Sequence, residues 1–430
     1  MKTIMRITKY KHFLLTLFAL CSYGVASSQQ QPDSLVHYLG MAAKNNPAVL
    51  QKWNEYQAAL QKVPQVGSLP DPELSLGVFL SPMELQGGNQ VADIQLMQMF
   101  PWFGVLKNAK DEMSLMAKAR FESFRETKLQ VFYDLQRTWF ELQKVQQNVR
   151  ISEKNMEILR TLERLSLIKF KAASPTGGSG LADLYRIQIE IGKLENDISL
   201  LKSQQNTVIA RFNGFLNRPP VSPVSLPEIL VPDTLRIPLK AVPDSMLANS
   251  PMLSMLRYEQ KSLESRKKMV TAMGYPMIGL GLKYSLINKS AMSTSPMNGK
   301  DMIMPMVTVT LPVYRKKYKA MQAEAGLMKT ATEQNYLATA NSLQTEYFEA
   351  MQLYQDSQRR IKLFEDQSKL AGKSLEIMIK SFSASGSGLT DVLLIRQQML
   401  DYEFSRIEAV VDFNISIAWL EKLMANSQIR

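Results

Sequence analysis

Apolar and polar residues alternate along four stretches of the chain, and this period of two is typical of β-strands with one apolar face. The stretches are residues 74–80, 92–100, 278–286 and 303–311. Polar loops at 81–90 and 288–301 separate the two members of each pair, so the pattern predicts two β-hairpins. Strands of about ten residues are long enough to cross a membrane.

The rest of the chain has the longer period of helices. From Val105 to Ala173 there is neither Gly nor Pro, and a continuous helix of that length would measure about 100 Å. A second long helix is predicted from Tyr314 to Ser381. A shorter one, from Asp33 to Lys62, precedes the first hairpin, with a break at Pro47, and Pro64 is expected to end helical structure there. After the first long helix, apolar residues recur at alternating spacings of three and four, which indicates a coiled-coil seam. They are Leu184, Ile187, Ile191, Leu194, Ile198 and Leu201.

Two nearly identical six-residue segments mark the bends between long helices. Ser-Gly-Leu-Ala-Asp-Leu occupies 179–184 and Ser-Gly-Leu-Thr-Asp-Val occupies 387–392. Each follows a run of small residues and joins two segments poor in Gly and Pro. Because the order helix, β-hairpin, long helix, bend, helix occurs twice, the chain is predicted to be an internal duplication.

The duplication sets the expected domain boundaries. These are a signal peptide at 1–28, the N-terminal helix of repeat 1 at 29–65, β-hairpin 1 at 66–106, long helical hairpin 1 at 107–218, a Pro-rich linker at 219–243, the first helix of repeat 2 at 244–270, β-hairpin 2 at 271–313, and long helical hairpin 2 at 314–430. The predicted fold class is therefore mainly α with a small β part.

Four strands cannot close a membrane barrel, since the smallest barrels of this kind need about eight. Open sheet edges are not tolerated in hydrocarbon, because their backbone groups would have no hydrogen-bond partner. The chain must then associate, and three copies would form a twelve-stranded barrel. The simpler alternative is a soluble helical protein with two peripheral hairpins.

The first residues have the composition of a secretory signal. Four cations, the last of them Lys11, precede the apolar run Phe13–Leu20, and small residues follow at 26–28. The only cysteine, Cys21, lies in this segment. It is a candidate lipidation site, although the bulky Leu20 before it fits a lipoprotein signal poorly. The formal net charge of +12 is spread along the chain and does not favour a nucleic-acid partner.

Catalytic chemistry has few candidates. Beyond the signal, the chain keeps only His37 among the histidines and no cysteine, which excludes the common metal and thiol sites. No nucleophile elbow or phosphate loop is present, so neither an enzyme nor a cofactor is predicted.

Methionine is abundant, with 26 residues. Met302, Met304 and Met306 share one strand face, and Met97 and Met99 share the corresponding face of another strand. Thioethers are ligands for soft cations such as Cu(I) and Ag(I), but methionine is also an ordinary filler of cores. No metal site is assigned, and the candidates for one are Met302, Met304 and Met306.

Aromatic and basic residues gather where each hairpin leads into a long helix. They are Trp102, Phe103, Tyr314, Arg315, Lys316 and Tyr318. Cations at a helix N-terminus oppose the helix dipole, whereas aromatic and basic side chains are favoured at a membrane interface. These residues are predicted membrane-interface anchors, and the alternative is a solvated basic helix start.

An aspartate follows each bend by one helical turn. Asp183 and Asp391 can simply stabilise the start of a helix. In three associated copies they would form a ring of six carboxylates that favours cations at a pore constriction. Both roles are compatible, and the two residues are predicted gate residues.

With these features the sequence resembles the TolC family of outer-membrane efflux proteins. The resemblance rests on the duplication, on the two Ser-Gly-Leu-x-Asp bends, and on the Pro-flanked strand ends at 100–104 and 311–314. The segments Phe-Pro-Trp-Phe-Gly and Leu-Pro-Val-Tyr resemble the heavy-metal, CusC-like branch.

The resemblance implies a homotrimeric duct, in which a twelve-stranded outer-membrane barrel is continued by an α-helical periplasmic tunnel. The duct would lie in the outer membrane of a Gram-negative bacterium, with most of its mass in the periplasm. The partners it implies are outer-membrane lipid, a periplasmic membrane-fusion adaptor and an inner-membrane pump of the resistance-nodulation-division type. The cargo it implies is small, and heavy-metal cations such as those of copper and silver are the specific candidates. The alternatives are an exit duct of type I protein secretion and a periplasmic coiled-coil scaffold that does not conduct.

The resemblance also implies roles for particular residues. The adaptor-docking tip carries over to Gly180, Leu181, Gly388 and Leu389, with Ser179 and Ser387 beside them. The gate carboxylate carries over to Asp391, and Asp183 is the equivalent position of the first repeat. The chain departs from the pattern at Leu394, where some relatives have a second acid, which weakens an aspartate gate.

Overall fold

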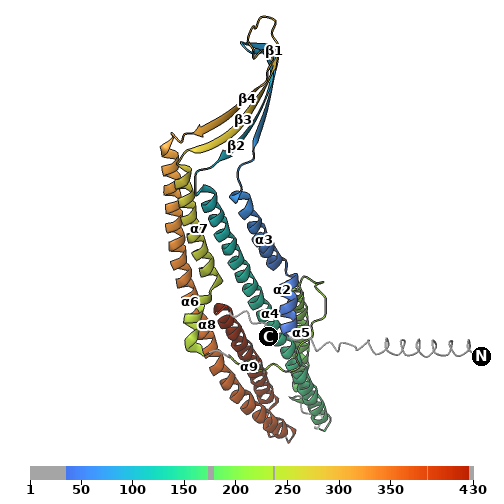
Figure 1. The fold of residues 1–430 in the computed structure, drawn as a ribbon. Helices are drawn as coiled ribbons and strands as arrows, with labels where there is room; N and C mark the ends of the chain where they lie inside the picture. The colour runs from blue at the N-terminus through green and yellow to red at the C-terminus, as the bar shows by residue number, and fades with distance from the viewer. Residues whose placement is uncertain (1–34, 173–178, 236–237, 385, 426–430) are drawn as a thin grey trace, which may run out of the picture.

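The computed structural model describes residues 35–172, 179–235, 238–384 and 386–425. The molecule is elongated, with a small β-sheet at one end, long helices along its length and two helical bends at the far end (Figure 1). The signal peptide and Cys21 predicted from the sequence lie outside the described residues. The predicted fold class, mainly helical with a four-stranded antiparallel part, is confirmed.

The four strands form one antiparallel sheet in the order β1-β2-β3-β4. Their bounds are β1 Glu73–Leu85, β2 Gly88–Phe100, β3 Met277–Asn288 and β4 Met302–Thr310. The two predicted hairpins are thus joined through the pairing of β2 with β3. The predicted polar loop at 81–90 is wrong, because β1 and β2 extend to a tight turn at 86–87. The register shifts between Val78 and Met83, and Pro82 is accommodated there on an edge strand.

The register places the aliphatic residues of the alternating stretches on one face of the sheet. The rows Leu76–Ile94–Tyr284–Ile303 and Leu74–Leu96–Leu282–Pro305 cross it. The opposite face carries polar and small residues and methionines, and it includes Asp93 paired with Lys283, together with Gly279 and Gly281. The face assignment that follows from period-two alternation therefore holds across β2, β3 and β4 from Ala92 onward, beyond the register shift between Gln90 and Ala92.

The helices of the first repeat begin and end at identifiable signals. They are α2 Leu35–Asn45, α3 Pro47–Gly67, α4 Val105–Ala172 and α5 Ser179–Phe215. Asn46 follows the last residue of α2 and caps α3, since its side-chain oxygen accepts hydrogen bonds from the amides of Ala48 and Val49. Pro47 thus starts a helix, as the N1 position allows. The prediction that Pro64 ends helical structure is wrong, because α3 continues to Gly67. Only the last turn of α3 lies beyond Pro64.

The second repeat follows the same pattern. Its helices are η1 Leu239–Ala241, α6 Val242–Asn249, α7 Pro251–Met273, α8 Arg315–Ser383 and α9 Leu389–Leu423. Ser250 caps α7 through a bond from the amide of Leu253, with Pro251 at the first position, which repeats the arrangement at Asn46. None of the described helices combines the length and the apolar composition needed to span a bilayer.

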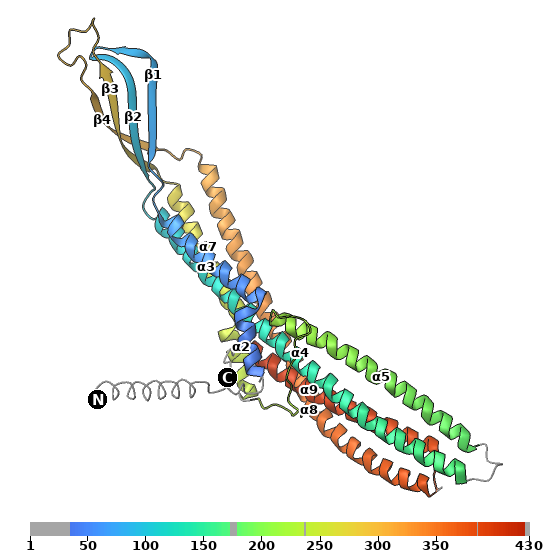
Figure 2. The same cartoon turned by 90° about the vertical axis from the view of Figure 1, so that its right-hand side faces the viewer.

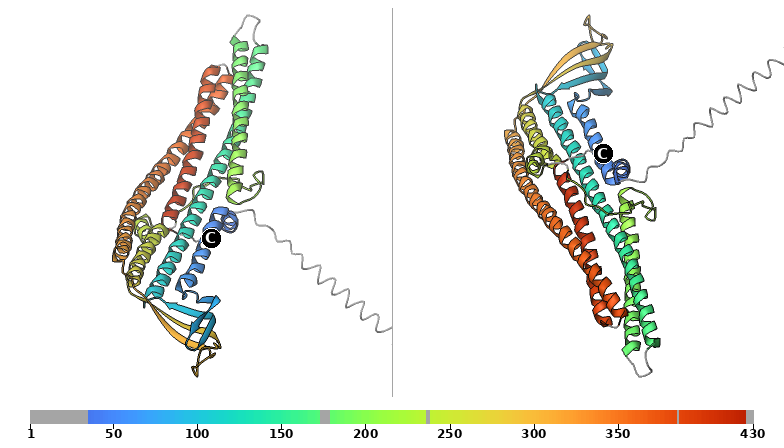
Figure 3. Two further views of the ribbon diagram at one scale, coloured as in Figure 1. Left: turned by 90° about the horizontal axis from the view of Figure 1, so that it is seen from above. Right: turned by 90° about the horizontal axis from the view of Figure 1, so that it is seen from below.

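The hydrophobic core is divided along the length of the molecule. One cluster, around Tyr38, Leu135, Trp139 and Phe212, joins α2 and α3 to α4 and α5 near the middle. Another joins the ends of α4, α5, α8 and α9 at the bends. Figures 2 and 3 show the α4–α5 hairpin beside the α8–α9 hairpin over the half of the molecule that ends at the bends. The two repeats therefore form one helical body whose bends lie at the end opposite to the sheet.

Candidate functional site

An apolar cluster joins the two helical hairpins at their bends. It contains Leu162 of α4, Ile187 of α5, Leu375 and Phe382 of α8, and Leu389 and Val392 of α9. All six are at most 3% exposed. Since every one of the four helices contributes, neither hairpin can move away from the other without exposing this cluster to water.

Polar contacts reinforce the same junction. The ammonium group of Lys169, in the last turn of α4, donates to the carbonyl of Phe382 on α8 and lies 3.8 Å from the centre of its ring. Arg186 of α5 donates from Nη1 to Oγ1 of Thr390 on α9, at 3.1 Å. Both contacts connect the first repeat to the second close to the bends.

A third contact is a buried ion pair. Arg396 of α9 is 2% exposed and donates from Nη2 to Oε2 of Glu190 on α5, at 2.9 Å, while the Glu190 side chain is 30% exposed. Nε and Nη1 of Arg396 have no hydrogen-bond partner among the described residues. Burial lowers the pKa of the guanidinium, opposed by the charge of Glu190. Arg396 stays charged even so, because its pKa begins far above neutrality.

This pair was not predicted from the sequence. A signal was present, because Arg396 lies four residues from Val392 and four from Leu400, both buried. A cation in the middle of an apolar stripe on a helix requires a partner. The sequence does not identify which of several acids on α5 supplies it.

At the first bend, the predicted docking residues open helix α5. Residues 173–178 are outside the described part, and Ser179 is the first residue of the helix. A Cβ on Gly180 would lie 3.2 Å from the ring of Phe170, so this glycine permits a close approach to α4. The side chain of Leu181 is 39% exposed and is available to a partner.

At the second bend, the equivalent residues lie differently. Ser387 donates from its hydroxyl to the carbonyl of Met378 at 3.3 Å, and Gly388 is the exposed N-cap of α9 in an extended conformation. Leu389 is only 2% exposed and belongs to the apolar cluster. In this conformation its side chain stabilises the junction and is not accessible to a partner.

The two candidate gate residues lie on adjoining helices. Asp391 is exposed in the first turn of α9, and Asp183 is half-buried near the start of α5. The bond between Arg186 and Thr390 connects the helices next to them. Asp391 also suits its place as an acid near a helix N-terminus.

The predicted interface residues converge at the junction between sheet and helices. Trp102, just after β2, stacks on Tyr275 at 5.4 Å and meets Phe103 edge-on. Tyr314 and Tyr318 line the same 400 Å³ pocket as Trp102 and Tyr275. The sequence analysis missed Tyr275, although it stands directly before Pro276 and β3. Arg315 and Lys316 open α8 and are exposed.

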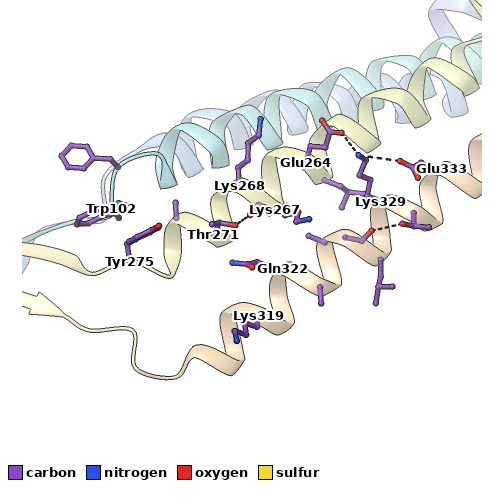
Figure 4. A pocket seen from close by; sticks show the side chains of 18 residues that line it. Trp102, Glu264, Lys267, Lys268, Thr271, Tyr275, Lys319, Gln322, Lys329 and Glu333 are labelled. Carbon is purple, nitrogen blue, oxygen red and sulfur yellow. Dashed lines mark hydrogen bonds and ion pairs between the residues drawn. The ribbon is translucent and has the colours of Figure 1, made fainter.

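A groove of about 1320 Å³ runs from this aromatic group along α7 and α8. Figure 4 shows Trp102 and Tyr275 at one end and the ion pairs of Lys329 with Glu264 and Glu333 at the other. Lys267, Lys268 and Lys319 also line it. The groove therefore carries a surplus of cations on the side nearest the sheet.

No protein-family model matches this sequence, and a search of curated proteins found no match. Solved structures do match. The CmeC outer membrane channel of Campylobacter jejuni superposes with a TM-score of 0.76 at 14% identity, covering 94% of this chain and 90% of that one. The CusC channel superposes with a TM-score of 0.73 at 14% identity, covering 92% and 95%.

This chain has the fold of those outer-membrane channels. The open-state MtrE channel of Neisseria gonorrhoeae gives a similar result, with a TM-score of 0.72 at 13% identity over 91% of this chain. Since the identities are low, the likeness establishes the channel fold and not the cargo or the partners. It agrees with the fold that the sequence resemblance implied.

Proposed function

We propose that this protein is the outer-membrane exit duct of a tripartite efflux system. The observation that carries the proposal is the apolar face of the sheet. Leu76 and Leu80 of β1 are 69% and 99% exposed, and Val307 of β4 is 70% exposed. An apolar face of this size is unfavourable in water, whereas it matches the lipid-facing surface of a membrane barrel.

The sheet edges support a homotrimer. In the four-stranded order, β1 and β4 each have one edge without a partner strand in the described chain. Such edges must be paired within hydrocarbon. Pairing β1 of one copy with β4 of the next closes a ring, and three copies form a twelve-stranded barrel above a tunnel of the long helices. The aromatic and basic residues at the junction then lie at the periplasmic surface of the outer membrane.

The bends are the proposed contact with a periplasmic adaptor, which connects the duct to an inner-membrane pump of the resistance-nodulation-division type. Gly388 and Leu181 are exposed there, as docking requires. The duct is a passive conduit, because the pump supplies the energy, and no catalytic group is involved. The proposed cargo is small, with heavy-metal cations such as those of copper and silver as the specific candidates.

The first test is the conductance of the purified full-length protein in planar bilayers, with cross-linking to determine the number of copies. A trimer that opens discrete ion-conducting pores is expected. A protein that inserts no pore while remaining folded would instead be a periplasmic scaffold and would overturn the proposal.

The docking role is tested by Gly388→Trp. A Cβ at Gly388 would make only an ordinary 3.7 Å contact with Asp391, and its backbone conformation is open to any residue. The variant is therefore expected to fold, to trimerise and to conduct, but to lose export in cells. Normal export would remove the docking assignment. Gly326→Trp, on α8 with no atom within 4 Å of a Cβ, is the matched bulky control.

A further inference from the structure

The methionines of β2, β3 and β4 all lie on the polar face of the sheet. Strand parity and register place them there together: Met97, Met99, Met277, Met302, Met304 and Met306. Polar face positions in a barrel normally carry polar side chains. A face that is otherwise polar or small and yet carries six thioethers is unusual, and packing against a hydrophobic core does not explain it.

Two glycines on β3 bring the thioethers together. Gly281 lies between Met97 of β2 and Met306 of β4 in one row across the sheet, and Gly279 lies opposite Met99 in the next row. A Cβ on Gly279 would lie 2.5 Å from the sulfur of Met99 and 3.2 Å from that of Met97. Both sulfurs therefore occupy the space that the missing side chain leaves.

Met97 packs closely over both glycines. Its sulfur would be 3.0 Å from a Cβ on Gly281, and the side chain is 7% exposed. Met306 is the register partner of the same glycine on the other side. Its Cα is about 10 Å from that of Met97, given two strand spacings. Two unbranched side chains with three rotatable bonds each can close that gap over a glycine.

The charged side chains next to these methionines do not prevent the binding of a cation. Lys283, one row nearer to the β1–β2 turn, forms an ion pair with Asp93, so its charge is compensated. The thioether is a soft, uncharged ligand that selects soft monovalent cations over Na⁺, Mg²⁺ or Ca²⁺.

From this geometry we infer that Met97, Met99 and Met306, held over Gly279 and Gly281, form a binding site for a soft monovalent cation, Cu(I) or Ag(I). The site is complete within one chain. It rests on the proposed function only for the route by which the cation arrives, since the polar face would line the water-filled interior of the barrel. Met302 and Met304 extend the thioether surface along β4 toward the loop at 289–301.

The test uses the full-length protein in detergent micelles with ¹³C-labelled methionine methyl groups, titrated with Ag(I) in chloride-free buffer. The methyl resonances of Met97, Met99 and Met306 are expected to shift together at about one equivalent per chain. The exposed loop residues Met292 and Met297 serve as internal references. Equal shifts at those two, or no shift at the three sheet methionines, would overturn the inference.

The triple variant Met97→Leu, Met99→Leu, Met306→Leu keeps side-chain volume and removes the sulfur. It is expected to lower the affinity for Ag(I) by at least about tenfold, the size commonly seen when even outer ligand-shell partners are lost. The matched control, Met292→Leu with Met297→Leu, should leave the affinity unchanged. Unchanged affinity in the triple variant would show that these methionines only fill space above the glycines.

Conductance measured on the same preparations separates this inference from the proposed function. A conducting trimer that binds no Ag(I) overturns the cation site alone. A protein that binds Ag(I) at these methionines but forms no pore overturns the duct alone.

Discussion

The ion pair between Glu190 and Arg396 is the contact whose removal has the most distinctive consequence. Glu190→Gln takes away the charge that compensates a guanidinium only 2% exposed, whereas Arg396→Met takes away the guanidinium and leaves a carboxylate that is 30% exposed to water. The two single changes remove the same contact, but they leave behind partners in very different surroundings.

The magnitudes follow from that difference. Breaking a buried pair typically costs about 3–5 kcal/mol, because the remaining charge is buried without compensation. The partial exposure of Glu190 puts this pair at the lower limit, about 3 kcal/mol for Glu190→Gln. Replacing both partners by uncharged groups of similar volume is often neutral. We therefore expect the order of destabilisation to be Glu190→Gln, then Arg396→Met, then the double variant close to the wild type.

The pair joins α5 to α9 beside the bends, so its loss should favour separation of the two hairpins. A change of about 3 kcal/mol shifts that equilibrium by about 100-fold. Two measurements check this: the open probability of single channels in planar bilayers, and distances between spin labels on the two hairpins. If the double variant is as open as Glu190→Gln, or if Arg396→Met is the more open single variant, the reasoning from the buried cation is refuted.

Three further predictions concern stability and assembly. Burial is the main cause that raises the pKa of Glu126. Its ionised form is thus disfavoured in the folded state, so the stability of the fold, measured as its melting temperature, should rise as the pH falls from 7 toward about 4.5. The variant Glu126→Gln should show a flatter dependence of the melting temperature on pH. Asn46→Ala removes the cap of α3 and should lower the stability of the fold by about 1 kcal/mol. The effect should be measurable as faster amide hydrogen exchange in the first turn of α3. Asn46→Ser is the control, because serine retains a capping side chain. Gly281→Val places a Cβ within 2.8 Å of the neighbouring strand and should prevent the formation of trimers, as measured on native gels. The control Gly326→Ala, where a Cβ has open space, should assemble normally. Trimers of Gly281→Val would contradict the close approach of the two strands.

The local periodicities of the sequence were sufficient to predict much of the fold. Alternation along 278–286 and 303–311 predicted both the strands and their faces, because successive side chains of a strand point to opposite sides. The absence of Gly and Pro over 105–173 predicted the long helix α4, because nothing in that segment interrupts backbone hydrogen bonding. The twin segments at 179 and 387 identified the two bends.

Local signals also misplaced some boundaries. The polar composition of 81–90 suggested a loop, but pairing with β2 extends β1 to Leu85, since an edge strand tolerates polar residues and Pro82. Pro64 was expected to end a helix, yet α3 continues one turn past it. In both places the neighbouring structure supplies hydrogen bonds or packing that local propensity does not include.

Only the tertiary structure decided which distant residues meet. Glu190 and Arg396 are 206 positions apart, and several acids on α5 could have been the partner by sequence alone. Leu181 and Leu389 occupy the same position of the repeat, but one is exposed and the other is buried in the cluster at the bends. Met97 and Met99 could be assigned to a face from the sequence, whereas the convergence of their sulfurs depends on Gly281 and Gly279 lying opposite them. Periodicity acts within an element and is encoded along the chain, while contacts between elements depend on how the duplicated halves pack against each other.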